Sequence, residues 1–86
     1  MDEKKLRLLD FMILKQAVRD CASKDQKLVK DSTDWFSSEA FKELCIRNEI
    51  DDSLIISGIK ELLRYPLISR KKYVNKIANI IDKRTT

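Results

Sequence analysis

Residues 38–59 decide the fold of this chain, and they read SEAFKELCIRNEIDDSLIISGI. Apolar residues recur at helical spacing on both sides of a short polar break, with Phe41 and Leu44 before the break and Ile55 and Ile59 after it. This pattern predicts two helices that are joined by a tight turn.

Helix caps and the single proline set the ends of these two helices. The first helix is expected to end near Asn48, and the second is expected to span roughly residues 53–65. The caps are Ser37 or Ser38 for the first helix and Asp51 or Asp52 for the second, and Pro66 stops the second helix.

Three further helices are expected, over residues 4–22, 26–36 and 69–82. In the helix over residues 26–36, Trp35 and Phe36 are predicted to anchor the core. In the helix over residues 4–22, one apolar stripe is expected to face the core, and Asp10 is left on the polar side. The stripe consists of Leu6, Leu9, Ile13 and Ala17 and is widened by Leu8, Phe11, Met12 and Val18.

The composition favours a purely helical domain. The 86 residues contain one glycine and one proline, and sheets and tight turns depend on both. We therefore expect an all-α fold, a compact bundle of four to five short helices that forms a single domain over residues 1–86 and contains a helix-turn-helix-like hairpin. Gly58 falls inside an expected helix, which predicts a close contact there, with Trp35 or Phe41 as its partner.

Several kinds of chemistry lack the residues that they need. The chain has no histidine, which removes the usual base for a serine or cysteine nucleophile and the commonest metal ligand. A chain with one glycine also has no glycine-rich phosphate loop. We therefore expect no enzyme activity, no cofactor and no metal site. We also expect Cys21 and Cys45 to be reduced and buried.

No apolar run approaches the length of a membrane span, because the longest covers residues 11–14. The first residues offer no small-residue cleavage site of a signal peptide. These features predict a cytoplasmic protein without a membrane partner.

Basic residues are concentrated at the C-terminal end. Residues 63–86 contain 7 Lys and Arg against 1 Asp, whereas residues 1–34 carry a net charge of +1 and residues 35–62 carry −3. Such a concentration of like charge predicts an anionic partner, such as double-stranded DNA, although a solvated helix face explains the same excess. The candidate nucleic-acid-binding residues are Lys60, Arg64, Arg70, Lys71, Lys72 and Lys76.

The hairpin has the rhythm of a helix-turn-helix, a unit whose second helix enters the major groove of DNA. Cys45 is the small residue where the helices would cross, and Ile50 is the inward anchor in the turn. Two features depart from that pattern, because Glu49 stands where glycine is favoured and because Asp51 and Asp52 begin the helix that would face phosphates. A hairpin that only packs the core explains the same spacing.

The run from Trp35 to Asp51 resembles a pattern in small phage and prophage proteins, which share a Trp, a break that contains Ser, an aromatic residue, and then a Cys and an Ile/Leu-Asp turn. The resemblance covers residues 28–59. Those proteins usually carry Gly where this chain has Glu49 and Pro where it has Asp52. The resemblance implies an origin in a mobile element and a helix-turn-helix-like fold.

Two functional hypotheses follow. In the first, the protein is a small non-catalytic binding module, a phage or prophage DNA-binding regulator that uses the basic C-terminal helix. In the second, it is a protein–protein adaptor or inhibitor that contacts a host protein or forms a homodimer. The surface for this second role would be the apolar face around Leu8, Phe11 and Met12, or the acidic segment from Glu39 to Asp52.

Overall fold

Five helices make up the part of the chain that the computed structural model describes, which is the backbone of residues 3–85 and the side chains of residues 5–82. They are α1 (Glu3–Asp20), α2 (Gln26–Phe36), α3 (Glu39–Arg47), α4 (Asp52–Arg64) and α5 (Leu67–Thr85). The predicted all-α bundle is therefore confirmed. None of these helices combines the length and the apolar character that crossing a membrane requires.

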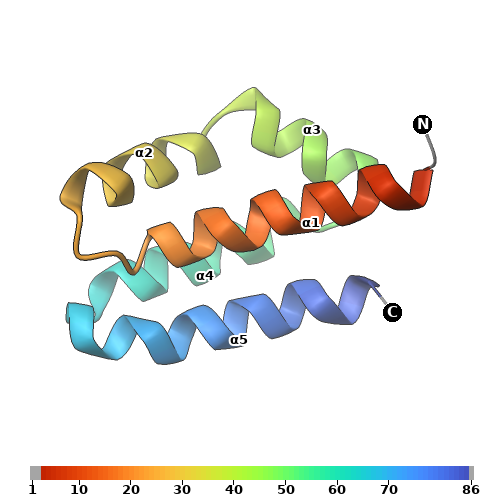
Figure 1. The fold of residues 1–86 in the computed structure, drawn as a ribbon. Helices are drawn as coiled ribbons and strands as arrows, with labels where there is room; N and C mark the ends of the chain where they lie inside the picture. The colour runs from red at the N-terminus through yellow and green to blue at the C-terminus, as the bar shows by residue number, and fades with distance from the viewer. Residues whose placement is uncertain (1–2, 86) are drawn as a thin grey trace.

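The first helix lies in the middle of the bundle (Figure 1). α2 and α3 follow one side of α1, and α5 runs along its other side. α1 packs against both α2 and α5, while α3 packs against α2 and α4 packs against α5. The turn between α1 and α2 lies at the same end of the bundle as the turn between α4 and α5, so residues far apart in the sequence meet there.

Local capping sets the starts of α3 and α4, as the sequence predicted. The hydroxyl oxygen of Ser38 accepts a hydrogen bond from the N–H of Phe41 at 3.4 Å. The carboxylate of Asp51 accepts one from the N–H of Ser53 at 3.0 Å. Each cap satisfies a backbone donor that the first turn of a helix leaves without a partner.

Three helix ends differ from the prediction by two or more residues. α1 ends at Asp20, two residues before the expected end. α5 begins at Leu67, two residues before Ser69, and ends at Thr85, three residues after the expected end. The early start of α5 follows from Pro66, because the fixed φ of proline suits the beginning of a helix and its missing N–H costs nothing there.

The turn between α3 and α4 contains a left-handed residue. Glu49 has a φ of 55°. The N–H of Ile50 donates to the carbonyl of Cys45 at 2.8 Å, and the N–H of Glu49 donates to the carbonyl of Ile46 at 3.2 Å. These two bonds form a Schellman motif, in which glycine is the favoured residue at the left-handed position.

We expect Glu49→Gly to raise the free energy of unfolding by about 1 kcal/mol, because it removes the steric cost of a left-handed residue that has a Cβ. Glu43→Gly is the matched control, since Glu43 is exposed inside α3. That variant should lose about 1 kcal/mol, because glycine is disfavoured in a helix interior. Urea denaturation of both variants measures the two changes, and a loss of stability in Glu49→Gly would contradict this account of the turn.

The core fills the space between the five helices, and its most deeply buried large side chains are Phe41, Leu14, Ile55, Leu62, Ile81 and Val18. Cys21 and Cys45 are free and buried, as predicted, and burial raises the pKa of each thiol to about 11. The neutral thiols therefore pack as small apolar groups.

Two predicted core contacts need correction. Phe36 is buried, but Trp35 is half-buried and packs against the edge of the core. Gly58 does not contact Trp35 or Phe41. A Cβ at Gly58 would lie 3.3 Å from Cγ1 of Ile77, so the close approach is between α4 and α5.

The face of α1 that enters the core also differs from the predicted stripe. Ala17 is buried, but Leu6, Leu9 and Ile13 are 38%, 45% and 51% exposed. Of the residues that widened the predicted stripe, Phe11 and Val18 are buried, as predicted, whereas Leu8 and Met12 are exposed. The buried residues among the described side chains of α1 are Asp10, Phe11, Leu14, Ala17 and Val18. Both sets have helical spacing, and the packing of α1 between α2 and α5 selects the second one.

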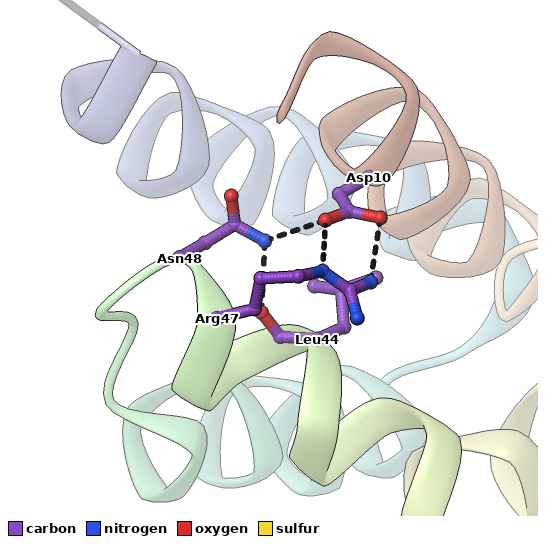
Figure 2. Close-up of polar contacts among 4 residues, drawn as sticks. All are labelled: Asp10, Leu44, Arg47 and Asn48. Atoms are coloured by element: carbon purple, nitrogen blue, oxygen red, sulfur yellow. Dashed lines mark hydrogen bonds and ion pairs between the residues drawn. The ribbon is translucent and has the colours of Figure 1, made fainter. Parts of the chain in front are cut away.

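A buried polar cluster joins α1 to the C-terminal end of α3 (Figure 2). Arg47 donates two hydrogen bonds to the carboxylate of Asp10, from Nε and from Nη2, each at 2.9 Å. The amide nitrogen of Asn48 donates to Asp10 at 2.8 Å and to the carbonyl of Leu44 at 2.8 Å. Asp10 and Asn48 are only 4% and 3% exposed, so this cluster fixes α3 against α1 and overturns the prediction that Asp10 lies on the polar side.

Candidate nucleic-acid interface

Five of the six candidate cations are exposed on α4 and α5, which run side by side from the turn at Pro66 (Figure 1). They are Lys60 and Arg64 on α4 and Lys71, Lys72 and Lys76 on α5. Within the described side chains, ion pairs join Lys15 to Asp82 and Arg47 to Asp10, and none of the five takes part in one. Their charges are therefore available to an anionic partner.

Arg70, the sixth candidate, is turned toward the protein. Its Nε donates to the carbonyl of Tyr65 at 3.0 Å, and its Nη2 and Nη1 donate to the carbonyls of Leu63 and Cys21 at 3.3 and 3.4 Å. These carbonyls lie at the C-terminal ends of α4 and α1, where helices leave acceptors without a partner. Arg70 thus holds the two helix ends together and does not belong to the exposed interface.

A hollow of about 360 Å³ lies between the end of α1 and the first half of α5. It is lined by Arg19, Ala22, Lys71, Val74 and Asn75. The side chains of two cations and one amide thus line the same hollow, next to two apolar residues. Such a set of donors suits a phosphate group.

Sequence reasoning missed Arg19 as a member of this site. Its signal in the sequence is weak, because a cation in the last turn of a helix is common and complements the helix dipole. The approach of α1 to α5 brings Arg19 beside Lys71, and that approach is a property of the tertiary structure.

Tyrosine rings support one of the exposed lysines. The Nζ atom of Lys76 lies 5.5 Å from the ring centroid of Tyr73. Tyr73 in turn stacks on Tyr65 with a centroid distance of 4.1 Å and an interplanar angle of 20°. Tyr73 therefore packs within the protein, and the cation–π contact restrains Lys76 while leaving its charge exposed.

The start of α4 is acidic, as the sequence indicated. Asp51 caps the helix, and Asp52 lies in its first turn. A helix-turn-helix would bring this end of α4 close to phosphates, which two carboxylates would repel. Lys60 and Arg64 lie in the last two turns of α4, the helix that packs against α5. The charges therefore favour an interface at the corner where α4 turns into α5, and not at the start of α4.

No group of three or more His, Cys, Asp or Glu side chains that could hold a metal ion lies among the residues that the structure describes. Searches of protein-family models, of curated proteins and of solved structures found no match to this chain. The resemblance of residues 28–59 to small phage and prophage proteins therefore stays a prediction.

Proposed function

We propose that this protein is a non-catalytic module that binds the phosphate backbone of double-stranded DNA through a basic surface at the α4–α5 corner. The basic surface consists of five cations of α4 and α5 together with Arg19 of α1, which lines the same hollow as Lys71; the five are Lys60, Arg64, Lys71, Lys72 and Lys76. The observation that carries the proposal is the hollow that Arg19, Lys71 and Asn75 line, because a phosphate there would have several donors around it.

The chemistry of this surface favours contacts with phosphate over contacts with base edges. Lysine and arginine bind the backbone of any duplex, and each contact releases counterions into solution. The acidic start of α4 opposes insertion of that helix into a groove. We therefore propose a cytoplasmic protein that binds duplexes of any sequence, or a phage-type regulator whose sequence preference has another source.

The salt dependence of binding tests this proposal. If all six residues of the basic surface contact phosphate, the affinity for a mixed-sequence duplex should fall about 1,000-fold between about 50 and 200 mM salt. Fluorescence anisotropy of a labelled duplex measures that fall. No binding at the lower salt concentration would retire the DNA proposal.

Reversal of two charges locates the interface. Lys71→Glu with Lys72→Glu should remove detectable binding, because two phosphate contacts become two repulsions. Lys30→Glu with Lys42→Glu is the matched control, since both residues are exposed on α2 and α3 and the net charge changes equally. Binding that survives in the first variant, or is lost equally in both, would show that the α4–α5 corner is not the contact.

A protein–protein adaptor is the second candidate, and the exposed apolar side of α1 favours it. Leu8 is 60% exposed and Met12 is 65% exposed, whereas Phe11 is buried and is not available to a partner. The acidic alternative has less support, because Asp51 is occupied in capping α4. A homodimer formed through the apolar side predicts a mass that rises with protein concentration and falls back in Leu8→Ser.

A further inference from the structure

A shallow groove of about 340 Å³ runs between α1 and α2, on surface that the basic residues do not share. Ile13 of α1 and Leu28 and Trp35 of α2 supply its apolar part. Asp20 and Asp31 supply carboxylates from the same two helices. We propose that this groove is a docking site for an amphipathic, basic helix of a partner protein, which places apolar side chains between α1 and α2 and lysine or arginine beside the two carboxylates.

The apolar part of the groove is open to solvent. Ile13 is 51% exposed and Leu28 is 41% exposed, so neither side chain is used by the core. On α1, Leu9 and Leu6 lie one and two turns before Ile13 and are also partly exposed, so the apolar strip continues along the helix. From Leu6 to Asp20 this strip is about 21 Å long, which matches a partner helix of about four turns.

Trp35 is suited to anchor a bound helix. Its ring contacts those of Phe36 and Phe41 edge-to-face, at centroid distances of 5.2 and 5.4 Å, and both of these rings are buried. The contacts hold the indole in one position while part of it stays exposed. Rigid, half-exposed tryptophans of this kind carry much of the binding energy at protein interfaces.

The charged residues that line the groove are acidic, so they favour a basic partner. No lysine or arginine is among the residues that line it, whereas Asp20 and Asp31 are. A symmetric contact with a second copy would bring the same patch against itself and would place carboxylates near carboxylates. The same two carboxylates would repel the phosphates of DNA. A helix with apolar residues at i, i+3, i+4 and i+7 and flanked by cations satisfies both parts of the groove.

The chain contains one tryptophan, and it lines the groove, so its emission reports on changes around this one residue. The probe is a synthetic helical peptide of about four turns that contains leucine at i, i+3, i+4 and i+7 and lysine elsewhere. The comparison peptide carries glutamate in place of each lysine. We expect the leucine–lysine peptide to shift the Trp35 emission to shorter wavelength in a saturable way and the leucine–glutamate peptide to leave it unchanged.

Variants separate binding in the groove from general attraction between charges. Leu28→Ser should weaken the leucine–lysine peptide by about tenfold, as expected for loss of an anchoring contact. Asp31→Lys should weaken it by about fivefold. Asp34→Lys is the matched control, because Asp34 is exposed on the same helix outside the groove, and it should retain the affinity. Circular dichroism confirms that each variant is folded.

Three outcomes would overturn this inference. The first is an unchanged emission with the leucine–lysine peptide, and the second is an equal loss of affinity in Asp31→Lys and Asp34→Lys. The third is an emission shift that appears on concentrating the protein alone and disappears in Leu28→Ser, because a second copy would then occupy the groove. Duplex binding should be unchanged in Leu28→Ser, so failure of this inference is distinguishable from failure of the DNA proposal.

Discussion

Phe41→Ala is expected to lower the free energy of unfolding by about 3–5 kcal/mol, because it removes a buried aromatic ring and leaves a cavity behind. Phe41 is 0% exposed. Its ring centroid lies 5.1 Å from that of Phe36 and 5.4 Å from that of Trp35, so both neighbours lose an edge-to-face contact. A domain of this length has a total stability of about 4–13 kcal/mol, so this loss is a large fraction of the total.

Urea denaturation followed by circular dichroism measures this loss, and three further variants calibrate it. Phe41→Leu keeps most of the volume and should cost about 1–2 kcal/mol, which leaves a folded protein to measure. Ile46→Ala lies on the same helix but at a residue that is 78% exposed, so its change should stay within about 0.5 kcal/mol. Trp35→Ala should cost less than Phe41→Ala, because Trp35 is half-buried. A larger loss in Trp35→Ala would contradict the ranking.

The boundaries of α3 and α4 were the most predictable part of the fold, because their causes are local. Ser38 and Asp51 cap helices through hydrogen bonds to residues two or three positions away, and Pro66 acts on its immediate neighbours. The inward positions of α3 and α4, such as Leu44 and Ile59, followed from one clear apolar stripe on each helix. In these segments local signals and packing agree.

The orientation of α1 was not predictable from the sequence, because that helix has two apolar stripes. One contains Leu9 and Ile13, and the other contains Phe11 and Leu14. Periodicity alone does not rank them, and the contacts with α2 and α5 choose the second. A buried Asp10 gives no local signal either, since its partner Arg47 lies on another helix.

The candidate site shows the same division between local and long-range causes. Exposure of Lys71 and Lys72 followed from the polar side of one helix. Arg70 donates to a backbone carbonyl at the end of α1, and Arg19 lies beside Lys71. Both placements depend on the packing of α1 against α5. The groove that contains Trp35 arises between two helices, so neither helix predicts it by itself.

The ion pair between Asp10 and Arg47 leads to the second large effect. Arg47→Ala is expected to cost about 2–3 kcal/mol at neutral pH, because it leaves the buried carboxylate of Asp10 without its cation. This expected loss is smaller than that for a fully buried ion pair, because the Arg47 side chain is 46% exposed and solvent screens its charge. Arg64→Ala, at an exposed arginine with no ion pair in the described structure, is the matched control and should change stability by less than about 0.5 kcal/mol.

A double variant distinguishes a stranded charge from a lost contact. Asp10→Asn keeps the shape of the side chain and removes its charge, so nothing charged remains buried when Arg47 is absent. The combination of Asp10→Asn with Arg47→Ala should therefore be more stable than Arg47→Ala alone, although it contains one more substitution. Additive losses in the double variant would mean that the pair acts through packing and not through charge.

The pH dependence of stability should differ between the wild-type protein and Arg47→Ala. Hydrogen bonds from Arg47 hold the pKa of Asp10 below its usual value of 3.8, against the opposing effect of burial. A carboxyl whose pKa is lowered by folding stabilises the protein above its unfolded pKa, and this contribution is lost as the pH falls through the folded value.

Without Arg47, burial raises the pKa of Asp10, and protonation in mildly acidic solution then relieves the buried charge. The difference in unfolding free energy between wild type and Arg47→Ala should therefore be largest near neutral pH and should shrink as Asp10 becomes protonated in both proteins. Urea denaturation at neutral and acidic pH tests this, and a difference that does not change with pH would exclude a charged Asp10 as the source of the loss.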